Sequence, residues 1–321
     1  MMQCRISNDE LLNKMKIEEF VELAPLTTMR VGGKARFFTI IKTQNELREA
    51  LAFVRDKKLP WMLLGGGSNL VFSDDDYPGI VLALKYHQLD WDVAKQEVTV
   101  GTGLLMRNLV EQTTQRGWAG LEWAGGLPGS VGGAIRGNAG AFGGETKDSV
   151  ISVTAIEAKT GREKNWQSNE CRFGYRTSLF KTEPWIIWEA RFKFIPGNPT
   201  ELDRIREEKI TYRKTHHPQA PSVGSIFQNL FLTDLPANFF DRFPELKDKI
   251  RGTKIGAGSL LEQLQMKGRR VGDAMVSMEH ANIVVNTGRA TAADIRALVS
   301  LMKQEVVAHF GIELHEEPQF V

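Results

Sequence analysis

Cysteine is nearly absent from this sequence of 321 residues. Only Cys4 and Cys171 occur, far apart and in no CxxC pair. Disulfide frameworks and cysteine zinc sites need several cysteines at short spacings. The six histidines do not replace them, because His216 and His217 are adjacent and cannot share one helix face, and no other histidine is near them in sequence. The sequence therefore indicates neither a disulfide framework nor a metal site.

Long apolar runs and an excess of one charge are also missing. No stretch approaches the roughly 20 apolar residues that cross a bilayer, and residues 1–22 lack the apolar core of a signal peptide. Lysine and arginine number 41 against 39 aspartates and glutamates, so there is no broad positive field for a nucleic acid. We therefore expect a cytoplasmic protein with no membrane or nucleic-acid partner. We also expect a monomer that acts on small molecules.

Common nucleotide-binding fingerprints are absent as well. The sequence has no GxxxxGK followed by Ser or Thr, and no GxGxxG that opens a helix with an acidic residue about 20 positions later. This disfavours a P-loop kinase or ATPase and an ordinary Rossmann dehydrogenase. The composition, 42% hydrophobic and 25% charged, is that of a globular protein. Because the chain exceeds the roughly 250 to 300 residues at which single cores stop growing, we expect two or three packed units.

Strands and helices alternate along the chain. The capping pattern of Thr43 and Glu46 predicts a helix over residues 44–57. Trp61–Leu64 is then predicted as a short buried strand. A turn or linker is predicted at residues 196–199, with a domain boundary near residue 200.

The C-terminal part of the chain shows two further helical patterns. Residues 200–216 are predicted to form one helix, and Thr291 is predicted to cap a second one that ends near Phe310. The last strand is predicted at residues 312–314.

Two glycine-rich segments carry the strongest functional signal. Gly65-Gly66-Gly67-Ser68-Asn69 directly follows a predicted strand, and glycines there can turn backbone N–H groups toward a phosphate. A tight turn without a ligand explains an isolated triple glycine equally well. The second segment, residues 125–134, is too long for a simple turn. Together the two segments suggest a large diphosphate ligand.

Several motifs follow one another in a fixed order from about residue 28 to the end of the chain. They are Thr28-Met29-Arg30-Val31-Gly32-Gly33, residues 64–74, residues 120–145, Phe173-Gly174-Tyr175-Arg176, residues 221–229, and Lys267-Gly268 through Ser277 to Asn282. Any one of them could arise by chance, but the ordered set is specific. In this order the sequence resembles the UDP-N-acetylenolpyruvoylglucosamine reductases, also called UDP-N-acetylmuramate dehydrogenases.

The resemblance implies an α+β protein with an FAD-binding fold of the vanillyl-alcohol-oxidase (PCMH) type in two subdomains, followed by a C-terminal α/β substrate-binding domain. The boundaries it implies are 1–88, joined by a C-terminal strand within 311–321, then 89–199 and 200–310. The spacing between Arg176 and Pro218 resembles the shorter branch of the family, which lacks an added tyrosine-bearing loop. The implied FAD-binding residues are Arg30, Gly65, Gly66, Gly67, Ser68, Asn69, Gly126, Pro128, Gly129, Ser130, Gly133, Asn138, Ala139 and Gly140.

The implied reaction reduces UDP-N-acetylglucosamine enolpyruvate to UDP-N-acetylmuramate, a step of peptidoglycan synthesis for the cell wall, with FAD as cofactor and NADPH as co-substrate. Arg176 would stabilise negative charge that develops toward the substrate carboxylate, for which a guanidinium offers bidentate contacts. Ser225 would donate the proton to the enol carbon. Glu317 would act with the arginine, and Glu316 is the fallback because Pro318 departs from the family pattern. Without the resemblance, these residues would be explained as an ion pair, a turn serine and a solvated acidic tail.

The implied substrate-binding residues are Tyr175, Arg213, Asn229 and Lys267. Gln228 stands where many relatives have lysine, so one contact to phosphate or sugar is replaced or absent. His280 matches a family landmark, and we interpret it as a structural histidine. Two alternatives remain: an FAD-dependent alcohol oxidase on the same fold, although neither glycine segment has a nearby His, Cys or Tyr to tether FAD, and a non-catalytic regulator that binds sugar nucleotides.

Overall fold

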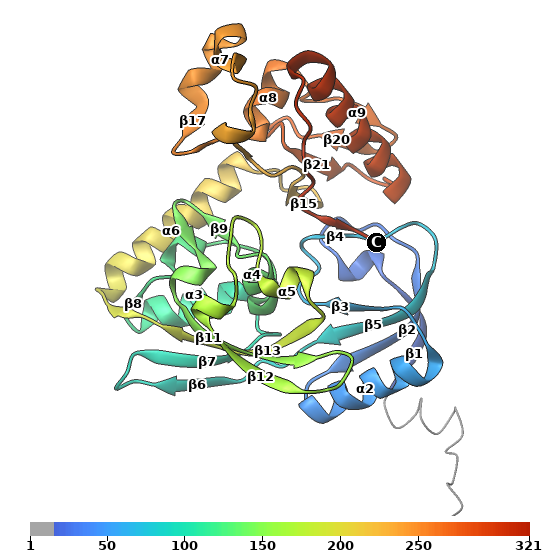
Figure 1. Ribbon diagram of the computed structural model, residues 1–321, viewed down its shortest axis with the longest axis vertical. Coiled ribbons are helices and arrows are strands. Elements are labelled where there is room, and N and C mark those ends of the chain that lie inside the picture. The colour runs from blue at the N-terminus through green and yellow to red at the C-terminus, as the bar shows by residue number, and fades with distance from the viewer. Residues whose placement is uncertain (1–15) are drawn as a thin grey trace, which may run out of the picture. The chain divides into compact units, whose positions relative to one another are not determined.

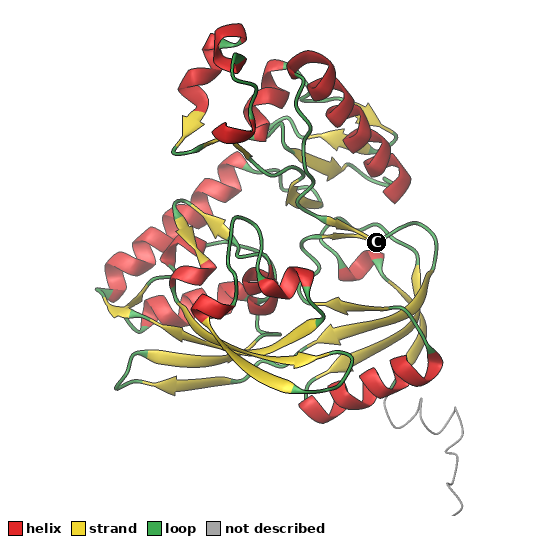
Figure 2. Ribbon diagram, in the orientation of Figure 1, coloured by secondary structure: helices red, strands yellow, loops and turns green. Residues whose placement is uncertain are grey.

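A computed structural model describes residues 16–321, so Cys4 and most of the segment tested for a signal peptide lie outside the described residues. Helices and strands are interspersed along the chain (Figure 2). Contacts divide the chain into two units. Unit 1 comprises residues up to 21, 34–66 and 77–211, and unit 2 comprises residues 22–33, 67–76 and 212–321.

The first sheet of unit 1 has the strand order β1-β2-β5-β3. Its strands are β1 (Glu18–Glu22), β2 (Lys34–Ile41), β5 (Tyr77–Leu84) and β3 (Trp61–Leu64). β2, β5 and β3 are parallel, and parallel strands need a crossover connection. Helix α2 (Gln44–Lys57) connects β2 to β3 and packs its apolar face into the core of this sheet (Figure 1). Helix α2 and the capping box of Thr43 and Glu46 are confirmed. The strand at Trp61–Leu64 is confirmed too, but only Leu64 in it is buried.

The second sheet of unit 1 is antiparallel, with the order β12-β11-β13-β7-β6. Its strands are β12 (Glu163–Gln167), β11 (Val150–Glu157), β13 (Trp185–Lys193), β7 (Glu97–Gly101) and β6 (Leu89–Asp92). Apolar side chains of this sheet and of the helices that follow β7, the second glycine segment and residue 178 form a second core. The remaining elements are α3 (Met106–Gln115), α4 (Val131–Arg136), α5 (Leu179–Thr182), β8 (Trp118–Ala119), β14 (Ile195–Pro196), β9 (Gly140–Ala141), β10 (Gly144–Glu145), η2 (Glu122–Ala124), η3 (Thr146–Asp148) and η4 (Ser168–Glu170).

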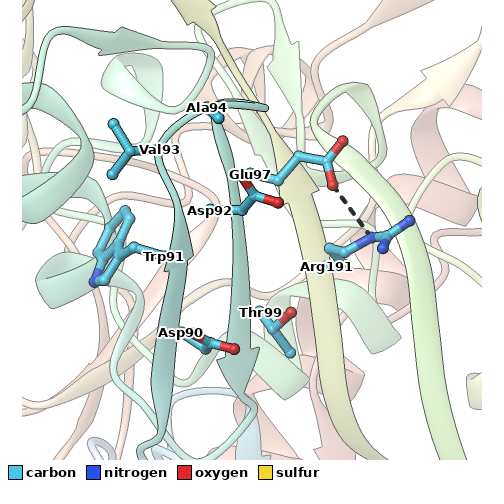
Figure 3. Close-up of a pocket in the computed structure, with 8 residues that line it drawn as sticks. All are labelled: Asp90, Trp91, Asp92, Val93, Ala94, Glu97, Thr99 and Arg191. Atoms are coloured by element: carbon cyan, nitrogen blue, oxygen red, sulfur yellow. Dashed lines mark ion pairs between the residues drawn. The ribbon is translucent and has the colours of Figure 1, made fainter.

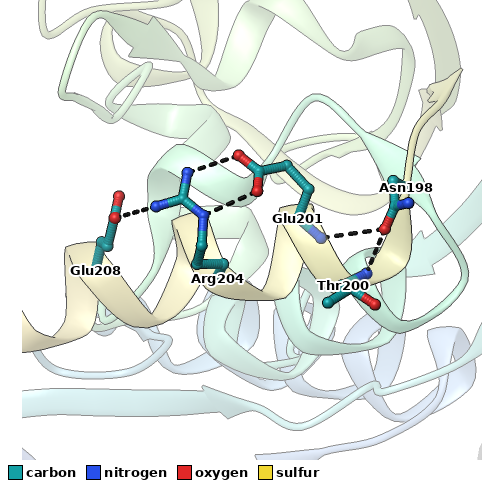
Figure 4. Close-up of polar contacts among 5 residues, drawn as sticks. All are labelled: Asn198, Thr200, Glu201, Arg204 and Glu208. Atoms are coloured by element: carbon teal, nitrogen blue, oxygen red, sulfur yellow. Dashed lines mark hydrogen bonds and ion pairs between the residues drawn. The ribbon is translucent and has the colours of Figure 1, made fainter.

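Helix α6 (Pro199–His216) starts where the sequence predicted a turn to end. The side-chain oxygen of Asn198 accepts hydrogen bonds from the N–H groups of Thr200 and Glu201 at 2.9 and 3.2 Å, which satisfies two orphan donors of the first turn (Figure 4). Arg204 pairs with both Glu201 and Glu208 on the exposed face. Local capping and i,i+3 or i,i+4 ion pairs thus support a helix that buries little apolar surface.

Unit 2 contains two small antiparallel sheets and one parallel strand pair. The strand orders are β15-β21-β20-β19 and β16-β18-β17, and β22 pairs with β4. The strands are β15 (Ser222–Ser225), β21 (Ile283–Asn286), β20 (Ala274–Val276), β19 (Arg270–Val271), β16 (Leu230–Phe231), β18 (Lys254–Ile255), β17 (Ile250–Arg251), β4 (Leu70–Val71) and β22 (Gln319–Phe320). The helices are α7 (Phe239–Arg242), α8 (Ala257–Gln263), α9 (Ala292–Phe310), η1 (Ala24–Leu26), η5 (Leu232–Asp234) and η6 (Pro244–Lys249). The predicted cap of α9 at Thr291 and its end at Phe310 are confirmed.

The C-terminal segment differs from the prediction. Residues 312–314 are not a strand, and the last strand is β22, which pairs in parallel with β4. Ile312 and Leu314 are nonetheless buried in the core of unit 2. Their apolar character therefore reflects side-chain packing, whereas strand pairing depends on a partner that lies far away in the sequence.

Candidate functional site

The two glycine-rich segments meet inside unit 1. A Cβ atom on Gly65 would lie 2.4 Å from Oγ of Ser130, and one on Gly66 would lie 2.6 Å from Cα of Gly129. Both distances are shorter than any real contact of a Cβ atom. Only glycine at residues 65 and 66 therefore allows the end of β3 to approach the second glycine segment this closely.

The second glycine segment leads into α4. Gly126 and Gly129 adopt positive φ angles of 72° and 100°, and Gly126 and Pro128 are exposed. Ser130 caps α4, because its hydroxyl accepts a hydrogen bond from N–H of Gly133 at 3.3 Å. Loops of this kind turn successive backbone N–H groups to one side, which suits a phosphate.

The remainder of the first glycine segment belongs to unit 2. Gly67 has a φ of 64°, and a Cβ atom there would lie 2.2 Å from the carbonyl oxygen of Leu26. The carbonyl oxygen of Gly67 accepts N–H of Thr28 at 3.1 Å, and Oγ1 of Thr28 is buried without a hydrogen-bond partner among the described residues. Burying a hydroxyl without a partner costs about 1 to 3 kcal/mol.

These features provide a test of whether the chain fits the diphosphate of FAD. Both glycine segments are shaped by close backbone contacts, an unpaired buried hydroxyl lies beside Gly67, and the side chain of Arg30 is exposed. Hydroxyl, guanidinium and backbone N–H groups are the donors that a diphosphate accepts. The residues therefore fit an FAD diphosphate.

A buried asparagine organises the region around the second glycine segment. Asn138 is fully buried, and its amide donates to Glu145 at 3.1 Å and to the carbonyl oxygen of Gly174 at 2.9 Å. Its side-chain oxygen accepts N–H of Lys147 at 3.1 Å. Asn138 thereby joins the hairpin of β9 and β10 to the turn that carries Tyr175 and Arg176.

Arg176 lies on a tight turn in which Gly174 and Thr177 exchange backbone hydrogen bonds at 3.0 and 3.3 Å. Its φ is 56°, which is unusual for a residue other than glycine. Its guanidinium donates to the carbonyl oxygen of Gly140 at 3.0 Å and lies 5.3 Å from the ring centre of Tyr175. Unit 1 thus brings together Asn138, Gly140, Tyr175 and Arg176. These four predicted site residues come from two different sequence motifs.

Ser225 ends β15 in unit 2, immediately after an irregularity in the sheet. Ser222 lies opposite Val285 and Ser225 opposite Ile283, so β15 has one extra residue between the two pairs. Gly224 adopts a φ of 78° there. Such a β-bulge re-aims the side chains next to it. The bulge and the positive φ of Gly224 thus come directly before Ser225.

The C-terminal segment runs beside Ser225 within unit 2. N–H of Glu317 donates to the carbonyl oxygen of Ile226 at 2.8 Å, and the amide of Asn69 donates to the carbonyl oxygen of Glu317 at 3.2 Å. The carboxylate of Glu316 lies 3.2 Å from Nζ of Lys303 on α9. Glu316 is thus held in an ion pair with Lys303, and Glu317 stays the predicted residue with Glu316 as its fallback.

Arg213 and Lys267, two predicted substrate-binding residues, flank a pair of histidines in unit 2. The rings of His217 and His280 lie 5.9 Å apart. Burial, with Arg213 and the neighbouring histidines, lowers the pKa of His217 from 6.5 to about 4, and burial and Lys267 lower the pKa of His280. Each histidine thus has a cation beside it, Arg213 for His217 and Lys267 for His280, and a cation can attract an anionic ligand.

The remaining predicted residues of unit 2 make mainly structural contacts. Oδ1 of Asn229 accepts N–H of Ala257 at 3.4 Å. The amide of Gln228 donates to the carbonyl oxygen of Glu316 at 3.4 Å, so it is turned to the C-terminal segment. Nδ1 of His280 accepts N–H of Asn282 at 3.1 Å, which supports its interpretation as a structural histidine. Lys267 pairs with Glu262 at 2.5 Å.

Sequence reasoning gave no role to three residues that the structure places beside the candidate site. They are Thr28, Gly224 and Asn282, each inside a motif that was noted. For Gly224, its position directly before the predicted proton donor Ser225 could have indicated a special backbone conformation. The contacts of Thr28 and Asn282 depend on the fold, and no pattern in the sequence could have revealed them.

One cavity of about 630 Å³ lies elsewhere, on the β6–β7 hairpin of unit 1 (Figure 3). Asp90, Asp92 and Glu97 line it together with Arg191, whose Nε lies 3.5 Å from the carboxylate of Glu97. None of the lining residues is a predicted site residue. The cavity lies along β6, the edge strand of the sheet, where charged side chains discourage pairing with other chains.

Within residues 16–321, no group of three or more His, Cys, Asp and Glu side chains is placed to hold a metal ion. No helix in that range is both long and apolar enough to span a bilayer. Cys171 is buried, and burial raises the pKa of its thiol to about 12, so the thiol stays protonated at neutral pH.

Two family models match the chain. An FAD binding domain matches residues 35–165, and the C-terminal domain of UDP-N-acetylenolpyruvoylglucosamine reductase matches residues 216–321. A curated UDP-N-acetylenolpyruvoylglucosamine reductase from Prochlorococcus marinus (strain MIT 9313) is 36% identical over 96% of this chain and 94% of its own length. One from Gloeobacter violaceus is 35% identical over 96% of this chain and 97% of its own length.

A solved structure agrees with these sequence relatives. The UDP-N-acetylenolpyruvylglucosamine reductase from Thermus caldophilus superimposes with a TM-score of 0.75 at 32% identity, covering 94% of this chain and 98% of that one. The predicted fold class, an FAD-binding fold followed by the reductase's own C-terminal domain, is confirmed. The chain belongs to the UDP-N-acetylenolpyruvoylglucosamine reductase family of FAD-dependent oxidoreductases.

Proposed function

We propose that this chain reduces UDP-N-acetylglucosamine enolpyruvate to UDP-N-acetylmuramate, with bound FAD as cofactor and NADPH as co-substrate, in peptidoglycan precursor synthesis. The observation that carries the proposal is similarity to curated reductases over nearly the whole chain. Arg176, Ser225 and Glu317 are the residues that the resemblance implies for the chemistry. We also keep the cytoplasmic location and the monomeric state as parts of this proposal.

The glycine segments would hold the diphosphate of FAD. Gly65, Gly66, Gly129 and Ser130 in unit 1, with Gly67 and Thr28 in unit 2, offer the backbone contacts and the unpaired hydroxyl described above. When bound, FAD supplies the hydride-transfer chemistry. The protein's own contribution is to bind, to orient and to place charge and a proton.

Arg176 would stabilise the negative charge that develops toward the carboxylate of the enolpyruvyl group. Its guanidinium is already oriented by the carbonyl oxygen of Gly140 and by the ring of Tyr175. Preorganised donors of this kind need no reorganisation during the reaction, which makes them effective.

Ser225 would deliver the proton to the enol carbon, with Glu317 acting at the same end of the substrate. A serine hydroxyl is a weak acid, so its efficiency depends on position more than on its ordinary pKa. The bulge before Ser225 and the bond between Glu317 and Ile226 support a fixed position for both residues. Tyr175, Arg213, Asn229 and Lys267 would bind the sugar nucleotide.

We retain the three-part domain organisation with boundaries at 1–88, 89–199 and 200–310, with the C-terminal strand joined to the first part. The core around the second sheet lies wholly within residues 89–199 and supports that part. The core around the first sheet also includes Ile156 and Ile186, and the core of unit 2 also includes Met29 and Val71, so these two cores cross the proposed boundaries.

The test is NADPH consumption by purified, FAD-loaded protein under low oxygen, with and without UDP-N-acetylglucosamine enolpyruvate. We expect consumption to depend strongly on the enolpyruvyl nucleotide. In stopped-flow measurements, Ser225→Ala should leave reduction of FAD by NADPH unchanged and slow its reoxidation by the enol ether roughly a hundredfold or more. Bound FAD without dependence on the nucleotide would overturn the reaction, and equal slowing of both half-reactions would overturn the role of Ser225.

A further inference from the structure

We propose that Asn282 is a positioning residue that fixes the proton-donating hydroxyl of Ser225 by clamping the main chain that follows it. This inference rests on the proposed role of Ser225 and adds the residue that makes the serine's position rigid.

The clamp consists of two hydrogen bonds from one side chain to one residue. Oδ1 of Asn282 accepts N–H of Phe227 at 3.0 Å, and Nδ2 of Asn282 donates to the carbonyl oxygen of Phe227 at 2.8 Å. The carboxamide therefore satisfies both backbone groups of Phe227, as a neighbouring strand would. Asn282 is 2% exposed and Phe227 is 1% exposed, so water cannot easily replace these bonds.

The backbone of Asn282 extends the clamp toward Ser225. Its carbonyl oxygen accepts N–H of Ile226 at 2.8 Å. The next residue, Ile283, lies opposite Ser225 in the pairing of β21 with β15. Three consecutive residues, from Ser225 to Phe227, are thus held against Asn282 and Ile283.

The opposite edge of the same segment carries the C-terminal residues. The carbonyl oxygen of Ile226 accepts N–H of Glu317, and Phe227 forms a β-bridge with Glu316. Residues 226 and 227 therefore lie between Asn282 on one side and the Glu316–Glu317 backbone on the other. A shift of Phe227 would move both Ser225 and the main chain of Glu317.

The clamp is needed because the sheet is irregular at this point. The bulge at Gly224 interrupts regular pairing just before Ser225, and regular pairing also ends just after it, since residue 226 is not part of a strand. Asparagine suits this place because its amide has both a donor and an acceptor. Asn282 is itself held by Nδ1 of His280, which accepts its N–H.

The experiment compares Asn282→Ala with wild type in the full-length, FAD-loaded protein. We expect reoxidation of reduced FAD by UDP-N-acetylglucosamine enolpyruvate to slow about ten- to a hundredfold, because small misplacements of reacting groups have effects of this size. Reduction of FAD by NADPH should not change. The solvent isotope effect on reoxidation should rise, because proton delivery becomes more limiting.

The decisive comparison uses Ser225→Ala as a background. If Asn282 acts through Ser225, the double variant should reoxidise FAD at the rate of Ser225→Ala alone. Hydrogen exchange should also speed up at the amides of residues 226–228 in Asn282→Ala. If Asn282→Ala is poorly folded, Asn282→Asp serves instead, because it keeps the acceptor for Phe227 but places an oxygen against the carbonyl of Phe227.

Asn286→Ala is the matched control. Asn286 is also a buried asparagine and is the last residue of β21. Its side chain makes hydrogen bonds with the main chain of Met29, Gly288 and Ala290. Its loss should lower stability while leaving reoxidation of the FAD-loaded fraction near the wild-type rate. Equal slowing in Asn286→Ala and Asn282→Ala, or full additivity of Asn282→Ala with Ser225→Ala, would overturn the inference. A Ser225→Ala enzyme that reoxidises FAD at the wild-type rate would instead overturn the proposed function of Ser225.

Discussion

Individual candidate-site residues in each unit adopt positive φ angles. Arg176 and Asn138 adopt φ angles of 56° and 40°, and Gly224 adopts 78°. Asparagine tolerates this region through local hydrogen bonds, whereas arginine does not have that advantage. A residue that keeps such a conformation must be held by its surroundings, and this strain is typical of functional positions. The surroundings of Arg176 are the tight turn and the carbonyl oxygen of Gly140.

A substitution at Gly224 tests whether its backbone conformation determines the direction of the Ser225 side chain. A Cβ atom at Gly224 would meet nothing within 4 Å, so Gly224→Ala introduces backbone strain without a clash. The left-handed conformation costs a residue with a Cβ about 1 to 2 kcal/mol, and the bulge should relax and turn Ser225. We expect slower reoxidation of FAD by the enolpyruvyl nucleotide, measured by stopped-flow absorbance.

Gly252→Ala is the control for this substitution. Gly252 also has a positive φ, 59°, and also has free space at its Cβ, but it lies in the turn between β17 and β18. Both variants should lose similar thermal stability. A comparable loss of reoxidation rate in both would show that the strain acts globally and not on Ser225.

At the scale of elements, helix α9 depends on a cap supplied from a distant part of the chain. Asp74 accepts N–H of Ala292 at 2.7 Å and of Ala293 at 2.9 Å, while Oγ1 of Thr291 accepts N–H of Asp294 at 3.0 Å. The carboxylate of Asp294 also accepts N–H of Thr291 at 2.9 Å, so all four orphan N–H groups at the start of the helix are satisfied. Asp74 also places negative charge at the positive end of the helix dipole.

Asp74→Ala should therefore lower the free energy of unfolding by about 1 to 2 kcal/mol, the usual cost of losing a helix cap. The measurement is the midpoint of thermal unfolding of the FAD-loaded protein. Asp75→Ala removes the same charge from the neighbouring exposed residue and should have little effect. If the two variants unfold at the same temperature, the contacts of Asp74 with α9 do not contribute to stability.

Elements with local signals were predictable, and elements that depend on distant partners were not. The capping boxes at Thr43 and Thr291 fixed the starts of α2 and α9 because each cap involves residues three apart. The strand predicted at residues 312–314 was wrong because burial and strand pairing give the same apolar pattern in a short run. β22 pairs with β4, from the opposite end of the chain.

The same limit applies to the candidate site. Separate motifs named Asn138, Gly140, Tyr175 and Arg176, yet the hydrogen bonds that gather them join residues 36 positions apart. The approach of Gly65 to Ser130 is likewise a property of the fold. The sequence could therefore nominate residue types through the resemblance, but their contacts required the structure.

At the scale of the whole molecule, the response to pH combines all titrating groups, and the half-buried histidines of unit 2 contribute to it. Burial, Arg213 and the histidines at 280 and 216 lower the pKa of His217 from 6.5 to about 4. The folded protein therefore keeps His217 neutral at a pH where the unfolded chain protonates it. Because the unfolded state binds more protons in this window, stability is fully present above about pH 6.5 and is lost as the pH falls toward about 4. The lowered pKa of His280 acts in the same direction.

His217→Gln should make the acid-induced loss of stability less steep between pH 6.5 and 4. The measurement is the thermal unfolding midpoint of variant and wild type at intervals through this range, compared as a difference so that carboxylate titration cancels. His309→Gln, which replaces an exposed histidine on α9, should follow the wild-type curve. A His217→Gln protein whose midpoint falls as steeply as that of wild type would show that the histidine pair does not set this part of the pH response. A shallower curve for His217→Gln alone would assign this part of the pH response to His217, whose pKa is lowered by burial and by Arg213.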